Sequence, residues 1–150
     1  MKHTFLFLIL GCAASLSFAG QTDNAPASGD VIKELSKRSG LSVSELKDLL
    51  SDCDANQQSM YFCAYRDLVA ADLVLKHVIR EKEKAFPSCK STIDADVSSW
   101  EKERNRGCEK SASKEYGEGS MKPTAEVMCI TFETQKMTQR IQKIQGCDLH

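Results

Sequence analysis

Apolar side chains recur along most of the chain with the spacing of an α-helix. One stripe, in which positions lie three or four residues apart, consists of Met60, Ala64, Leu68, Ala71, Leu75 and Val78, and Pro87 ends it. A second stripe with this spacing consists of Val127, Ile130, Thr134, Met137, Ile141 and Ile144. Such stripes predict amphipathic helices, and no segment alternates convincingly with the period of two that marks a strand. The pattern therefore predicts an all-α chain.

Two short helices are predicted before these long ones, with Gly40 as the break between them. Their inner faces carry Val31, Ile32 and Leu35 in the first helix and Leu46, Leu49 and Leu50 in the second. Ser42 or Ser44 is the expected N-cap of the second helix.

A further helix is marked by Ile93, Val97 and Trp100, and we expect it to run to about Arg106 and end at Gly107. The segment 111–123, SASKEYGEGSMKP, is rich in serine and glycine and is predicted to be a loop. Because the apolar stripes must cover one another to be buried, the expected architecture is a small helical bundle.

The first twenty residues have the features of a secretory signal peptide. Lys2 precedes an apolar run that ends at about Leu16, and the small residues Ser17 and Ala19 follow. We expect cleavage after Ala19, so that residues 1–19 are removed and no stable transmembrane segment remains; the run is too short to span a bilayer. A second interpretation takes ILGC as a lipobox with Cys12 lipidated. The expected location is the periplasm or the medium.

The remaining chain divides into three parts by composition: a flexible leader at 20–29, a helical hairpin at 30–52 and a helical domain at 53–147. The residue pattern of this hairpin is similar to that of a helix-turn-helix DNA-binding motif. Loss of Lys2 leaves 19 basic and 21 acidic side chains, a net charge of −2, in an exported chain. A net charge of −2 does not indicate the positively charged surface that binds nucleic acid, so no nucleic-acid partner is expected.

Six cysteines remain after cleavage: Cys53, Cys63, Cys89, Cys108, Cys129 and Cys147. An even number in an exported chain predicts three disulfides. None of the six shows CxxC spacing, which argues against a thioredoxin-like motif or a zinc knuckle. We therefore expect no metal and no cofactor.

Six cysteines allow fifteen pairings, and the helices favour one of them. Cys108 and Cys129 flank the serine- and glycine-rich loop and are the first expected pair. Antiparallel packing of two helices brings Cys89 to Cys147. Cys53 is then left with Cys63, a pair that requires Cys53 to lie outside the helix, with Asn56 as the N-cap.

From Cys53 to Ile141 the chain resembles the LprI-type lysozyme inhibitor domain, a small exported helical module of bacteria. The resemblance is carried by these residues: Cys53, Gln58, Met60, Cys63, Ala64, Ala71, Asp72, Leu75, Trp100, Arg104, Cys108, Glu118 to Met121, Cys129, Thr134 and Ile141. The chain departs from the family pattern at Tyr61, Lys76, Glu103, Asn105, Glu118 and Met137.

The resemblance implies a protein that binds lysozyme and blocks its cleft, which carries two carboxylates. We expect the disulfide-closed loop to make this contact through Tyr116, Ser120 and Lys122. Asp72 and Arg104 are expected to have structural roles, Arg104 by pairing with Asp72 or with a helix-end carbonyl. An alternative is a non-inhibitory envelope module of the same fold that binds another envelope protein.

An enzyme is not expected, and no catalytic residue is assigned. Catalysis needs a nucleophile with a base, paired carboxylates or a metal. Disulfide formation leaves no free thiol, and His77 has no visible serine or aspartate constellation around it.

Overall fold

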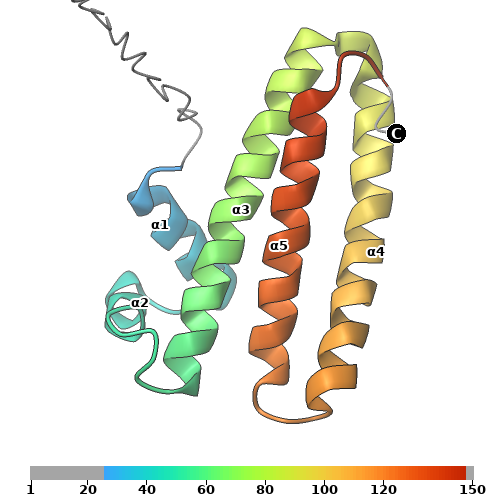
Figure 1. Ribbon diagram of the computed structural model, residues 1–150. Coiled ribbons are helices and arrows are strands. Elements are labelled where there is room, and N and C mark those ends of the chain that lie inside the picture. Colours follow the sequence, from blue (N-terminus) through green and yellow to red (C-terminus); the bar gives the residue numbers. More distant parts are fainter. Residues whose placement is uncertain (1–25, 148–150) are drawn as a thin grey trace, which may run out of the picture.

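The computed structural model describes residues 26–147 as helices joined by short connections (Figure 1). The elements are α1 (Ser28–Ser39), α2 (Val43–Leu49), α3 (Gln57–Ala85), the 3₁₀ turn η1 (Pro87–Cys89), α4 (Lys90–Tyr116) and α5 (Lys122–Lys143). No strand occurs among these residues, so the all-α prediction is confirmed. The predicted signal peptide, most of the leader and the alternative lipidation site Cys12 lie outside the described residues. Within 26–147, no helix has the length and hydropathy needed to cross a membrane.

The three long helices stand side by side, and α5 lies between α3 and α4 (Figure 1). One hydrophobic core joins these three helices through Leu75 of α3, Ile93 and Val97 of α4, and Met137 and Ile141 of α5. Ile93 and Ile141 have no exposed surface. Trp100 is partly buried against this core. Because residues from all three helices share the core, the apolar stripes predicted from the sequence face one another.

A second core lies on another side of α3, where α1 and α2 pack. Leu35 of α1, Leu46 of α2 and Val69 of α3 are fully buried there. Phe62 and Leu73 of α3 are partly buried beside them. The helix-turn-helix-like segment thus uses its apolar face to cover α3. The apolar stripe predicted for α3 from the sequence marks only the face directed at α5, where Met60 and Ala64 are half-buried. It does not include the α3 residues that pack against α1 and α2.

The prediction that the Trp100 helix ends at Gly107 is wrong, because α4 continues to Tyr116. Glycine in a helix interior costs about 1 kcal/mol relative to alanine. Cys108 and Ala112 lie beyond Gly107 and are 1% and 4% exposed, so their burial outweighs this cost. The predicted loop 111–123 is correspondingly reduced to residues 117–121.

Helix starts follow the predicted capping chemistry. The Ser42 hydroxyl accepts a hydrogen bond from the Glu45 backbone N–H, and the Glu45 carboxylate accepts one from the Ser42 N–H. The Ser42 hydroxyl also donates to the Glu45 carboxylate at 2.6 Å, and this bond, together with the bond from the Ser42 N–H, lowers the pKa of Glu45. The side-chain oxygen of Asn56 accepts a 3.0 Å bond from the Ser59 N–H, which places Cys53 outside α3.

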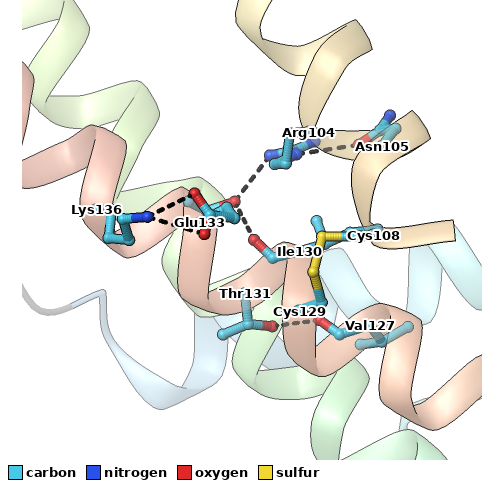
Figure 2. The surroundings of a disulfide bond; sticks show 10 residues. Arg104, Asn105, Cys108, Val127, Cys129, Ile130, Thr131, Glu133 and Lys136 are labelled. Atoms are coloured by element: carbon cyan, nitrogen blue, oxygen red, sulfur yellow. Dashed lines mark hydrogen bonds and ion pairs between the residues drawn. A yellow bond between two sulfur atoms is a disulfide. The ribbon is translucent and has the colours of Figure 1, made fainter. Parts of the chain in front are cut away.

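Three disulfides connect the elements, in the same pairs that the helix arrangement suggested. Cys53–Cys63 ties the turn before α3 to its second turn, with Cα atoms 5.8 Å apart. Cys89–Cys147 joins η1 to the chain beyond α5. Cys108–Cys129 links the C-terminal third of α4 to α5 (Figure 2).

Candidate functional site

The connection between α4 and α5 is a tight turn at one end of the bundle (Figure 1). Gly117 ends α4 with φ +58°, a conformation that favours glycine, and its N–H donates to the Ser113 carbonyl at 2.9 Å. The Gly119 N–H donates to the Tyr116 carbonyl at 2.9 Å, and the Lys122 N–H donates to the Gly119 carbonyl at 3.0 Å. Successive backbone hydrogen bonds therefore define the shape of the turn.

The three side chains expected to bind a partner lie in or next to this turn. Tyr116, on the last turn of α4, is 38% exposed, and a hydrogen bond to Glu115 raises its pKa. Ser120 is exposed within the turn. Lys122 opens α5, and its Nζ lies 3.0 Å from the Glu118 carboxylate. The Lys122 side chain is only 21% exposed, whereas that of Glu118 is 90% exposed.

Two features restrict movement of this turn. The Cys108–Cys129 disulfide fixes α4 to α5 about two helical turns away from it. A side chain at Gly119 would place its Cβ 2.8 Å from the Tyr116 carbonyl oxygen, closer than such atoms approach. The loop is therefore closely packed at its backbone and anchored at its base.

A polar cluster around Asp72 joins four helices. Arg38 of α1 places Nη1 2.6 Å from Asp72 Oδ2 and Nε 2.9 Å from Glu34. Arg104 of α4 donates from Nη1 to the Thr134 hydroxyl of α5 at 2.8 Å, and this Nη1 lies 3.9 Å from Asp72 Oδ1. The carboxylate of Asp72 therefore faces two guanidinium groups.

Arg104 is held from several directions. Its Nε donates to Asn105 Oδ1 at 3.0 Å (Figure 2), and its guanidinium carbon lies 4.8 Å from the centre of the Trp100 ring. Only 9% of its side chain is exposed. A cation over a tryptophan face is stabilised by the ring quadrupole, so Trp100 and Thr134 fix the orientation of Arg104.

Arg38 is the cluster member that the sequence did not indicate. Its contact with Asp72 is shorter than that of Arg104, the partner considered from the sequence. Burial lowers the pKa of Arg38, but hydrogen bonds to Asp72 and Glu34 outweigh this effect, and the pKa is raised. Arg38 lies in a charged stretch of a short helix, where no spacing distinguishes it from the neighbouring Lys37.

Residues 26–147 contain no group of three or more histidine, cysteine, aspartate or glutamate side chains placed to hold a metal ion. The cysteines among them are the six joined in disulfides. The α4–α5 turn carries a phenol, a hydroxyl and an ammonium group, and the polar cluster around Asp72 lies between the helices.

A comparison with protein families finds that the profile described as "Lysozyme inhibitor LprI" matches residues 51–141. The chain belongs to the LprI lysozyme inhibitor family. The matched segment covers α3, η1, α4 and nearly all of α5, and it leaves α1 and α2 outside. Neither the curated proteins nor the solved structures contain a match to this LprI-family chain.

Three residues that carry the LprI pattern meet in the polar cluster: Asp72, Arg104 and Thr134. Arg38 comes from α1, outside the matched segment, and adds the shortest contact with Asp72. Membership of this inhibitor family suggests a lysozyme-inhibitor-like function rather than an enzymatic one. The disulfides and the family are both consistent with an exported protein.

Proposed function

We propose that this protein is exported after cleavage at Ala19 and inhibits lysozyme by inserting the α4–α5 turn, with Tyr116, Ser120 and Lys122, into the enzyme's cleft. The observation that carries the proposal is the shape of the turn: it lies at the end of a helical hairpin, and a disulfide fixes its base. A loop ordered before binding loses less conformational entropy when it binds, and so binds more tightly.

The chemistry of the turn suits a cleft with two carboxylates. The ion pair between Lys122 and Glu118 involves a largely exposed carboxylate, and such pairs contribute about 0–1 kcal/mol. Exchange of Glu118 for a lysozyme carboxylate therefore costs little. Tyr116 adds an apolar ring with a hydroxyl, a side chain that is common at binding hot spots.

The direct test is an assay of bacterial cell-wall hydrolysis by several lysozyme types, with purified, oxidised protein of residues 20–150. We expect inhibition of at least one type and its loss after disulfide reduction. Absence of inhibition of every type at micromolar protein, with helical circular dichroism intact, would contradict the proposal.

Replacement of both polar side chains of the turn, Ser120→Ala with Lys122→Ala, is expected to raise the inhibition constant about 10- to 100-fold, the range for a contact of 1.4–2.8 kcal/mol. The reason is loss of a hydroxyl and of the cation directed at the carboxylates. Urea denaturation should show a smaller loss in free energy of unfolding, because Ser120 is exposed and the Lys122–Glu118 pair involves a largely exposed carboxylate; the single variant Ser120→Ala should leave the free energy of unfolding almost unchanged. Inhibition equal to that of the wild type would exclude these side chains as contacts.

Substitution of a glycine by alanine separates the shape of the turn from general stability. Gly119→Ala brings Cβ within 2.8 Å of the Tyr116 carbonyl oxygen, so the turn must shift and inhibition should weaken at least about tenfold. Gly107→Ala is the matched control: nothing lies within 4 Å of its Cβ, and the helix should gain about 1 kcal/mol in unfolding free energy. Equal inhibition by both variants would show that turn shape is unimportant.

The second candidate is an envelope module that binds a protein other than lysozyme. Two of the departures from the family pattern favour it, because Lys76 and Glu103 are exposed on α3 and α4, where they would alter recognition. Size-exclusion chromatography with lysozyme separates the candidates: an inhibitor elutes with lysozyme, whereas a module for another partner leaves it free.

A further inference from the structure

Two large apolar side chains are exposed on α5, one helical turn apart. Met128 is 59% exposed and Phe132 is 60% exposed, both more than Tyr116 at the α4–α5 turn. Side chains four residues apart lie on one face of a helix. They therefore form a single apolar projection, which contributes nothing to either core.

A hollow lies beside this projection, between α3 and α5. It has a volume of about 180 Å³ and is lined by Ala64, Asp67, Thr131 and Gln135 together with Met128 and Phe132. Asp67, Thr131 and Gln135 also line a larger groove of about 510 Å³, which continues along the same helices past Ala70 and Val74. Because a cavity of about 150 Å³ holds benzene, the hollow is large enough for one phenyl ring.

The charges around this hollow are balanced. Arg66 pairs with Asp67 at 2.8 Å on α3, and Glu133 pairs with Lys136 at 3.0 Å on α5 (Figure 2). One positive and one negative group thus stand on each side. Two copies of such a face meet without net repulsion, and a basic group of one copy can oppose an acidic group of the other.

We propose that this face binds a second copy of the chain, with Phe132 of each copy inserted into the hollow between α3 and α5 of the other. A twofold dimer places the same patch of both subunits in contact, so the patch must be complementary to itself. Here an aromatic projection stands next to a hollow of suitable size, and the charges are balanced. The contact is separate from the α4–α5 turn and leaves that turn free in each copy.

The test is analytical ultracentrifugation of the oxidised protein, residues 20–150, from low to high micromolar concentration. The wild type should show a concentration-dependent shift from monomer to dimer. Phe132→Ala should raise the dissociation constant at least about tenfold, because it removes the aromatic ring that fills the hollow of the other copy. Tyr116→Ala, which removes the other exposed large aromatic side chain among residues 26–147, should leave the dimer unchanged.

A variant that fills the hollow distinguishes insertion of Phe132 from nonspecific hydrophobic association. Ala64→Leu adds apolar surface but occupies the hollow, so self-association should weaken at least about tenfold, the consequence of lost contact worth 1.4 kcal/mol. Circular dichroism checks that each variant is folded. Stronger self-association of Ala64→Leu would overturn insertion, and a wild type that stays monomeric at every concentration would overturn the dimer.

The lysozyme assay, run on the same variants, keeps this proposal separate from the proposed function. A dimer that inhibits no lysozyme supports the contact described here while the inhibitor function fails. A monomeric wild type whose inhibition is lost in Phe132→Ala would assign this face to lysozyme and overturn the dimer.

Discussion

Removal of the Cys89–Cys147 disulfide is expected to lower the free energy of unfolding by about 4 kcal/mol, the largest effect of any change considered for this protein. The bridge closes a segment of 58 residues, and the entropy that a cross-link removes from the unfolded chain grows with the logarithm of that length. It also secures the η1 end of the bundle, where Cys89 and Ile144 are both buried in the main core. Total stabilities of 5–15 kcal/mol are typical, so the variant should be close to unfolding.

The measurement is urea denaturation of Cys89→Ala with Cys147→Ala under oxidising conditions, followed by circular dichroism. The two shorter bridges are the controls. Removal of Cys108–Cys129, with a separation of 21, should cost about 3.3 kcal/mol, and removal of Cys53–Cys63, with a separation of 10, about 2.7 kcal/mol. A different order of the three losses would show that native packing, rather than unfolded-state entropy, sets the contribution of each bridge.

Asp72→Asn is expected to lower the free energy of unfolding by about 2–3 kcal/mol. Breaking a fully buried ion pair costs about 3–5 kcal/mol, because the remaining charge stays buried without a partner. The value is reduced here because 20% of the Asp72 side chain is exposed. The asparagine has nearly the same shape, so the loss reports the missing charge between Arg38 and Arg104.

Urea denaturation again provides the measurement, with Glu81→Gln as the matched control. Glu81 lies on the same helix and pairs with Lys84 at 2.8 Å, but both side chains are exposed, so its loss should leave the free energy of unfolding almost unchanged. Equal effects of the two variants would contradict a stabilising cluster.

A double-mutant cycle of Asp72→Asn with Arg38→Met then isolates the contribution of α1. Residues in direct contact show coupling energies of about 0.5–3 kcal/mol. Additive losses would mean that the 2.6 Å contact between Arg38 and Asp72 does not fasten α1 to the family domain.

The helices, several of their caps and the cysteine pairs were predictable because each depends on local rules. Ser42 and Asn56 cap helices through bonds to residues three positions away. The pairing of Cys89 with Cys147 required only that the last two helices run antiparallel. The end of α4 was not predictable in this way, because glycine at position 107 is a local signal that distant packing of Cys108 and Ala112 overrides.

The candidate site shows the same difference between features set by neighbouring residues and features set by tertiary packing. The sequence placed Tyr116, Ser120 and Lys122 in one connection, since they are close along the chain. It gave no sign that Glu118 pairs with Lys122 or that Gly119 has no room for a side chain, because both follow from the exact path of the turn.

The sequence by itself thus determined an all-α chain with its family pattern, because helical periodicity and cysteine spacing are properties of neighbouring residues. Only the tertiary structure decided which sides of α3 are covered, that Arg38 reaches Asp72, and that Phe132 is left exposed beside a hollow. Such contacts join residues tens of positions apart, and they depend on how whole helices rotate and pack against one another.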